Sequence, residues 1–169
     1  SRSGLSITNM VQRNLNMPIV NLGFSGNCFM EPALFKALAE IDARIYVIDP
    51  IPNSHRFAES EIVKRITEGI NILRQKDNTP IVLVQNYVAS DNLMMKMSYA
   101  SYLAGSASVL KAYKALKQQG VKNIFLLEKE KIILGEEGMI EGSHPNDFGS
   151  LVYARAYTDI LKKVLARTK

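Results

Sequence analysis

Residues 63–84, VKRITEGINILRQKDNTPIVLV, contain two different apolar spacings in succession, and this change indicates how the chain folds. In the first part, apolar residues recur at the three- and four-residue intervals of a single helix face. These residues are Val63, Ile66, Ile70 and Leu73. The last four residues are apolar on both faces, as in a strand buried within a parallel sheet. The stretch therefore predicts a helix followed by a buried strand over residues 81–84.

The same alternation of helix and strand extends along the whole chain. Short apolar runs predict further strands over residues 19–22, 43–48 and 123–127. Helical spacing predicts helices over residues 5–15, 32–40, 55–76, 102–119 and 148–166. This order predicts an α/β fold, a three-layer αβα sandwich with a doubly wound parallel sheet whose ligands bind beyond the carboxyl ends of the strands. Because there is no linker or repeat, we expect residues 1–169 to form one domain.

The composition is that of an ordinary globular domain, with 47% hydrophobic and 22% charged residues. The net charge of +5 comes from 21 Lys and Arg residues that are dispersed along the chain, so we expect no nucleic-acid partner. No apolar run is long enough to span a bilayer, and the polar start is no signal peptide. We therefore expect a soluble protein without a membrane partner. Its compartment stays open, export to a bacterial periplasm or medium included, and so does its oligomeric state.

The small number of cysteines and histidines limits the possible metal chemistry. The chain has one cysteine, Cys28, and two histidines, His55 and His144. A single cysteine excludes an internal disulfide, and so few ligands argue against a zinc centre, so we expect no metal. Cys28 is more typical of a small buried apolar residue than of a nucleophile. His55 is expected at the start of a helix rather than in a ligand set.

A carboxylate, Glu141, precedes His144 by three residues in the segment 141–147, EGSHPND. A carboxylate that accepts a hydrogen bond from one ring nitrogen fixes the histidine tautomer, so that the other nitrogen can take a proton from a nucleophile. Gly142 allows the backbone to turn, and residues 145–147 indicate a turn into a helix that begins near Phe148. The segment predicts a general base on a loop. The alternative is a solvent-exposed histidine beside a helix cap.

Two other segments follow predicted strands and should lie at the same edge of the sheet. Residues 21–27, NLGFSGN, follow the first strand, and Asn53 follows the second. The glycines of this segment let a backbone N–H point at a ligand, and the Asn53 amide can donate a hydrogen bond, so together the two segments predict an oxyanion hole. The glycine segment could instead be a plain tight turn or a phosphate loop, although it lacks the glycine spacing and lysine of the latter. Asn53 could be a simple turn residue.

These residues, in this order, resemble an SGNH hydrolase of the GDSL-like lipase/acylhydrolase superfamily, in particular its bacterial acetylhydrolase-like branch. The resemblance covers nearly the whole chain. It implies a flavodoxin-like sheet, oxyanion donation by Gly26 and Asn53, and a base at His144 oriented by Glu141 within a catalytic triad. It also implies a serine esterase without a cofactor, acting on small acyl esters such as acetyl groups, carbohydrate esters among them.

The chain departs from the family pattern at two places. Glu141 stands where most members have Asp, which changes the reach of the carboxylate. The family's nucleophile block, on a strand before the glycine segment, has no counterpart here, so we expect the first strand to be missing and the serine to lie upstream of Ser1. Ser25, in Gly23-Phe24-Ser25, is the fallback nucleophile within the chain. The absent block also leaves open a non-catalytic, ligand-binding module of the same fold.

Overall fold

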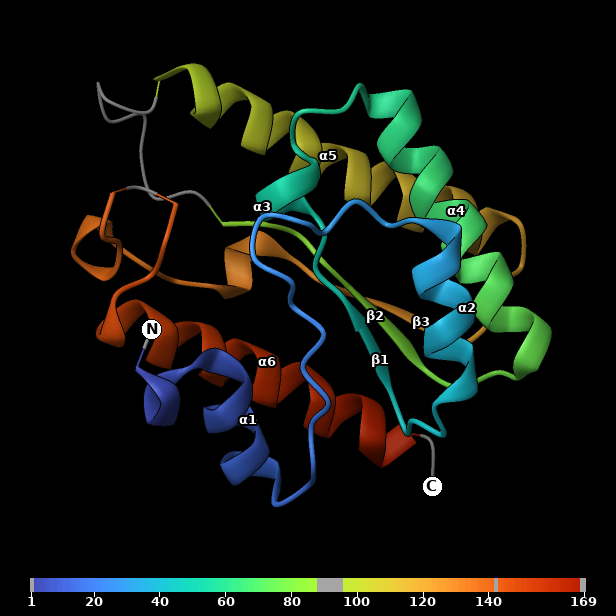
Figure 1. Cartoon of the computed structure of the whole chain (residues 1–169), viewed down its shortest axis with the longest axis horizontal. Helices are drawn as coiled ribbons and strands as arrows, with labels where there is room; N and C mark the ends of the chain where they lie inside the picture. Colours follow the sequence, from blue (N-terminus) through green and yellow to red (C-terminus); the bar gives the residue numbers. More distant parts are fainter. Residues whose placement is uncertain (1, 88–95, 142, 168–169) are drawn as a thin grey trace.

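The computed structural model describes residues 2–87, 96–141 and 143–167, and it alternates helix and strand along the chain (Figure 1). The strands are β1 (Tyr46–Ile48), β2 (Ile81–Val84) and β3 (Ile124–Leu127). The α-helices are α1 (Ile7–Leu15), α2 (Pro32–Glu40), α3 (Ile51–Ser54), α4 (Glu59–Lys76), α5 (Lys96–Gln118) and α6 (Asp147–Arg167). Short 3-10 helices cover Ser3–Leu5 (η1), Lys129–Lys131 (η2) and Glu136–Gly138 (η3). The predicted α/β class is confirmed.

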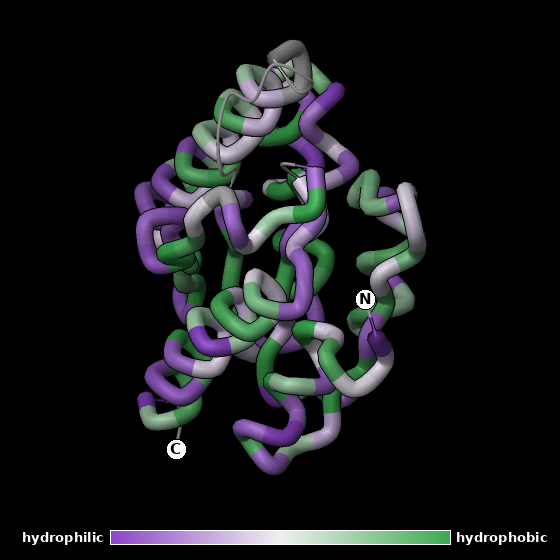
Figure 2. The backbone as a smooth tube through the Cα atoms, turned by 90° about the vertical axis from the view of Figure 1, so that its left-hand side faces the viewer, coloured by the Kyte–Doolittle hydropathy of each residue, from purple (hydrophilic) through white to green (hydrophobic). Residues whose placement is uncertain are grey.

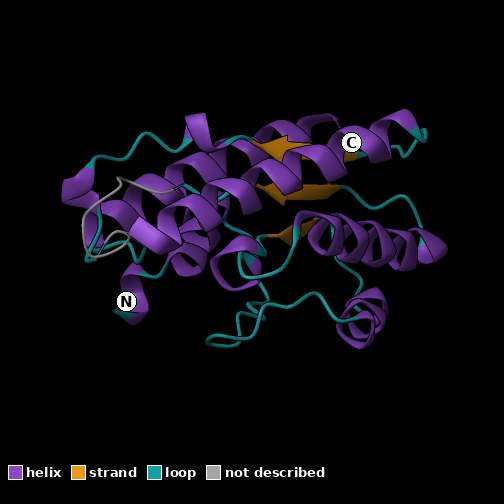
Figure 3. Ribbon diagram, turned by 90° about the horizontal axis from the view of Figure 1, so that it is seen from above, coloured by secondary structure: helices purple, strands orange, loops and turns teal. Residues whose placement is uncertain are grey.

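Strand β2 lies at the centre of the described sheet and runs parallel to β1 on one side and β3 on the other (Figure 3). All four of its side chains are buried, and they alternate between two apolar cores. Ile81 and Leu83 face the core that includes residues of α2, α4 and α5. Val82 and Val84 face the core that includes residues of α1 and α6. The sheet is therefore the middle of three layers, as expected for an αβα sandwich.

The distribution of hydropathy follows these layers, with hydrophobic segments running through the centre of the tube trace in Figure 2. The two apolar cores lie on opposite faces of the sheet, and each is formed by short segments of several helices and strands. Among the helices in the described ranges, none has the length and apolar content needed to cross a membrane.

The predicted strand over residues 19–22 is wrong, because this segment is an irregular loop between α1 and α2. Its side chains are not buried, and Val20 is 66% exposed. The loop runs on the side of β1 that faces away from β2 (Figures 1 and 3). The Tyr46 N–H donates to the Pro80 carbonyl oxygen at 2.9 Å, toward β2. Because successive residues of a strand point their N–H and C=O groups to opposite edges, those of Val47 point to the edge away from β2. Within the described ranges no strand pairs with that edge, and residues 19–22 form no ladder with it.

The other predicted elements are present, with shifts at their ends. Helix α2 has the predicted bounds, whereas the strand predicted over residues 43–48 shortens to β1. The helix predicted over residues 55–76 begins only at Glu59, since residues 51–54 form the separate short helix α3. Acidic residues in the first turn of α4 and basic residues in its last turn complement the helix dipole and account for these ends.

Candidate active site

His144 lies on a tight hairpin, residues 138–147, which we call the histidine loop. Met139 and Pro145 form an antiparallel bridge across its base. The Ile140 N–H donates to the His144 carbonyl oxygen at 2.8 Å, and the Asn146 N–H donates to that of Gly138 at 3.0 Å. Gly142, to which the turn was assigned, lies outside the described residues. These backbone bonds hold His144 near the tip of the loop.

The start of α6 fixes the histidine loop to the fold. Asn146 Oδ1 accepts a hydrogen bond from the Gly149 N–H at 3.0 Å, as a helix-capping side chain does. Asn146 Nδ2 donates to the Glu137 carbonyl oxygen at 2.6 Å. A Cβ atom on Gly149 would lie 2.0 Å from the Gly138 carbonyl oxygen, so a glycine is required where helix and loop approach. The His-Pro-Asn sequence thus combines the histidine with its own anchor.

Glu141 and His144 are in direct contact. Glu141 Oε1 hydrogen-bonds His144 Nδ1 and also accepts from the His144 backbone N–H at 3.0 Å and from Ser143 Oγ at 2.7 Å. Binding of the carboxylate to Nδ1 leaves Nε2 as the nitrogen that can accept a proton. Within the described part of the chain, no side chain hydrogen-bonds Nε2, and the His144 side chain is 78% exposed. This arrangement can act as an oriented base that faces solvent.

The carboxylate of Glu141 is suited to this contact because it stays ionised. Partial desolvation acts to raise its pKa, but hydrogen bonds from Ser143 and His144 outweigh that effect and hold the pKa below its ordinary value. An ionised carboxylate stabilises the imidazolium that forms when a histidine takes up a proton.

Gly26 lies in a four-residue turn that follows the loop of residues 19–22. The Asn27 N–H donates to the Phe24 carbonyl oxygen at 2.9 Å, and Gly26 has a φ of 72°, a left-handed conformation that favours glycine. The turn is exposed, so the Gly26 N–H lies at the surface of the molecule. The residue predicted as an oxyanion donor therefore occupies a backbone conformation that favours glycine.

Asn53 lies in the short helix α3 and not in a simple turn, which was the alternative interpretation. Its Oδ1 accepts a hydrogen bond from the Cys28 N–H at 3.1 Å, while Ser54 Oγ donates to the Cys28 carbonyl oxygen. We call these three residues the asparagine clamp. Because an N–H can only donate, the clamp requires the oxygen of Asn53 to face Cys28, which leaves Nδ2 as the donor. In the described residues Nδ2 has no hydrogen-bond partner.

The structure divides the predicted site residues into two groups. The asparagine clamp ties Asn53 to residue 28, two positions beyond Gly26, and the histidine loop joins Glu141 to His144. Between the described residues of the two groups there is no hydrogen bond. Ser25, the fallback nucleophile, lies on the exposed Gly26 turn, where its carbonyl oxygen accepts from Asn27 Nδ2 at 2.9 Å. Its hydroxyl does not hydrogen-bond His144.

Asp49 is a buried carboxyl group that the sequence reasoning did not single out. Its Oδ2 accepts a hydrogen bond from the Tyr157 hydroxyl of α6 at 2.6 Å, whereas Oδ1 is buried with no partner among the described residues. Burial raises the pKa of Asp49 to about 6, although the Tyr157 hydrogen bond acts to lower it. Its position directly after β1 was the available signal, since polar residues at strand ends face the ligand edge of such sheets.

Cys28 takes part in the asparagine clamp through its backbone and is a poor nucleophile. Burial, followed by the charges of Asp49 and Glu31, raises the pKa of its thiol to about 11, so the reactive thiolate is scarce at neutral pH. Within the described ranges, no cluster of three or more His, Cys, Asp or Glu side chains could hold a metal ion.

The chain belongs to the GDSL-like lipase/acylhydrolase family, whose family model matches residues 1–162. Among solved structures, it is similar to a protein described as a GDSL-like lipase from Bacteroides ovatus, with 28% sequence identity and a TM-score of 0.88 over 98% of this chain. No curated protein is similar enough to count as a match.

More distant structures share the fold alone. A salicylyl-acyltransferase, SsfX3, from a tetracycline biosynthetic pathway has 16% identity and a TM-score of 0.78 over 95% of this chain. Est24, a carbohydrate acetylesterase from Sinorhizobium meliloti, has 15% identity and a TM-score of 0.70, and 95% of this chain matches 86% of its length. The chain spans 49% of the length of both the Bacteroides protein and SsfX3.

Proposed function

We propose that residues 1–169 form one hydrolase domain of a serine esterase that cleaves small acyl esters, with His144 as general base. The observation that carries the proposal is the contact between Glu141 Oε1 and His144 Nδ1, which leaves Nε2 available to the nucleophile. Membership of the GDSL-like lipase/acylhydrolase family supports an ester substrate. Acetyl groups on carbohydrate are proposed as substrates because the fold neighbour Est24 is described as a carbohydrate acetylesterase.

The proposed reaction transfers an acyl group to water in two steps. His144 Nε2 takes the proton of a serine hydroxyl, the serine oxygen attacks the ester carbonyl, and the negative charge develops on the carbonyl oxygen. The Gly26 N–H and Asn53 Nδ2 donate hydrogen bonds to that oxygen. His144 then protonates the departing alcohol, and the C–O bond of the ester breaks. In the second step a water molecule, activated by His144, releases the acid and restores the serine.

For the nucleophile, we propose a serine upstream of Ser1. Arg2 pairs with Asp147 at 3.4 Å, which brings the described start of the chain beside the histidine loop. Among the described residues, no strand pairs with the outer edge of β1, and this edge offers a place for a further strand. Ser25 remains the alternative within the chain, and its lack of a hydrogen bond to His144 disfavours it.

The test measures hydrolysis of a short-chain aryl acetate by this chain and by the protein with the residues upstream of Ser1 included. Each is compared with its His144→Ala variant. We expect hydrolysis by the longer protein that disappears in the variant. Equal rates with and without His144 in the longer protein contradict the esterase proposal. Activity of the short chain that is abolished by Ser25→Ala would instead assign the nucleophile to Ser25.

The second candidate is a ligand-binding module without catalysis. It is favoured by one observation, that no serine hydroxyl in the described residues hydrogen-bonds His144 Nε2. Ligand binding by both lengths of the protein without any turnover supports this candidate.

A further inference from the structure

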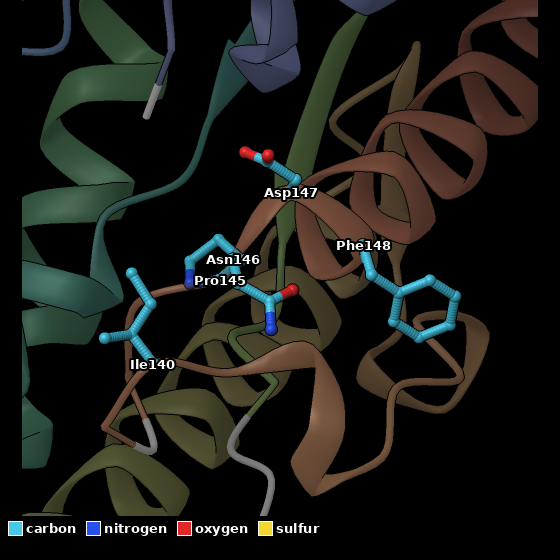
Figure 4. Close-up of a pocket in the computed structure, with 5 residues that line it drawn as sticks. All are labelled: Ile140, Pro145, Asn146, Asp147 and Phe148. Carbon is cyan, nitrogen blue, oxygen red and sulfur yellow. The ribbon is translucent and has the colours of Figure 1, made fainter.

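An open hollow of about 440 Å³ lies directly against the histidine loop (Figure 4). It is lined by Ile140, Pro145, Asn146, Asp147 and Phe148. The Ile140 N–H hydrogen-bonds the His144 carbonyl oxygen, and Pro145 follows His144 in the chain. Two of the residues that line the hollow are therefore direct neighbours of the proposed base. Ile140, Asp147 and Phe148 take no part in the proposed reaction.

The walls of the hollow combine exposed apolar side chains with one carboxylate. Ile140 is 71% exposed and Phe148 is 56% exposed, so both present apolar surface that a ligand could cover. Figure 4 shows the Phe148 ring and the Asp147 carboxylate extending in different directions from the start of α6, with Ile140 and Pro145 on the side away from Phe148. A flat apolar group can therefore lie on the hollow while a second part of the same molecule approaches Asp147.

Asp147, the charged residue that lines the hollow, is acidic, although the protein as a whole is basic. Between Lys131 and Arg155 the sequence contains four carboxylates and no Lys or Arg, although the chain carries a net charge of +5. The carboxylates are Glu136, Glu137, Glu141 and Asp147. One of them, Asp147, is partly neutralised by its exposed pair with Arg2 at 3.4 Å. A negatively charged ligand in the hollow would meet like charge.

The chemistry of the proposed reaction indicates which part of an ester would lie there. His144 must reach the oxygen of the departing alcohol to protonate it, so the alcohol part of the ester lies on the histidine side of the reacting carbon. The acyl oxygen lies on the opposite side, toward Asn53. The hollow lies on the histidine side of the reacting carbon, because residues of the histidine loop line it.

We propose that this hollow is the subsite for the alcohol part of the ester, that it takes ring-shaped alcohols through Ile140 and Phe148, and that Asp147 makes it reject anionic ones. The inference rests on the proposed esterase function. It adds a substrate preference that the catalytic residues do not imply, namely acceptance of neutral and cationic alcohols.

Binding of three matched aryl acetamides, which place an aryl group where the alcohol would be, tests the subsite. The probes are acetanilide, which is neutral, 4-acetamidobenzoate, which is anionic, and 4-(acetamido)benzylammonium, which is cationic. Backbone amide shifts at residues 140, 147 and 148 report binding to this chain. We expect acetanilide to bind about tenfold more tightly than the anion, and the cation to bind at least as tightly as acetanilide. Neutral-to-anion discrimination below about threefold, or shifts elsewhere only, overturns the proposal.

Variants assign the effect to the proposed residues. Asp147→Asn is expected to reduce the neutral-to-anion ratio to about twofold. Ile140→Ala and Phe148→Ala are expected to weaken all three probes about three- to tenfold. Ile133→Ala is the matched control, because Ile133 is 84% exposed on the same segment but does not line the hollow. An unchanged ratio in Asp147→Asn, or equal losses for Ile133→Ala and Ile140→Ala, contradicts the assignment.

Hydrolysis of the corresponding aryl acetates separates this inference from the function on which it rests. If hydrolysis depends on His144 but is indifferent to Ile140, Asp147 and Phe148, the subsite fails and the esterase proposal stands. If the probes bind as expected and no form of the protein hydrolyses the esters, the esterase proposal fails and the hollow remains a binding site, without its assignment to an alcohol.

Discussion

The histidine loop and the asparagine clamp are built in contrasting ways. In the loop, Glu141 contacts a residue three positions away, and the side chains of His144 and Glu141 are 78% and 44% exposed. In the clamp, the hydrogen bonds of Asn53 and Ser54 span 25 and 26 residues to reach Cys28, and Ser54 is fully buried. The comparison indicates that the proton-transfer half can change with little effect on folding, whereas the oxyanion half is coupled to the core.

The largest expected effect tests the independence of the loop. His144→Ala should lower kcat of the active protein by about a thousandfold or more and leave the free energy of unfolding unchanged, because the side chain is 78% exposed. Enzyme kinetics and urea denaturation measure the two quantities. His55→Ala is the control, since the His55 ring packs against Tyr102 with centroids 4.1 Å apart, and its loss should cost about 1 kcal/mol of stability but no activity. The reverse pattern contradicts the comparison.

The second-largest expected effect is on stability and concerns the buried carboxyl group of Asp49. Its pKa is raised from 3.8 to about 6 in the folded protein, so its contribution to stability is fully present below about pH 4 and is lost as the pH rises through 6. The loss amounts to about 3 kcal/mol. Asp49→Asn removes this titration, so between pH 4 and pH 7 its unfolding free energy relative to the parent should shift by about that amount in favour of the variant. Parallel stability curves for the two proteins would falsify the assignment.

Asn53→Ala should affect both folding and catalysis. Loss of an oxyanion donor costs about a hundredfold in kcat, and loss of the hydrogen bond to Cys28 costs about 1 to 2 kcal/mol of stability. Ser54→Ala is the matched variant, because it removes the other bond of the clamp and should destabilise the fold similarly with kcat nearly unchanged. A hundredfold loss in both variants would mean that the clamp acts only through folding.

The smallest effect concerns the family departure at residue 141. Glu141→Asp shortens the side chain, so one carboxylate oxygen can no longer reach the His144 ring, its backbone N–H and Ser143 together. We expect about a tenfold loss in kcat, with stability unchanged, by the same measurements. Full activity would show that the longer side chain has no special role in this loop.

The same contrast explains what the sequence could predict. The helices, β2 and the Glu141–His144 pair follow from spacing between near neighbours, and they are present as expected. The strand over residues 19–22 was predicted from a short apolar run, but a strand also needs a partner for its N–H and C=O groups, which such a run does not report. The Asp49–Tyr157 bond and the asparagine clamp join residues 108 and 25 positions apart, so no local pattern reveals them. The roles of Gly26, Asn53 and His144 remain predictions.

The close approach of Gly149 to Gly138 has a consequence for transplanting this loop between proteins. With only 2.0 Å between a Cβ at position 149 and the Gly138 oxygen, any side chain there would push the whole hairpin outward and carry the imidazole with it. The hairpin and the first turn of α6 therefore form one structural unit, and both must be transferred together. A chimaera that exchanges residues 138–146 alone, into a helix without this glycine, should misplace the histidine even when every residue of the loop is copied.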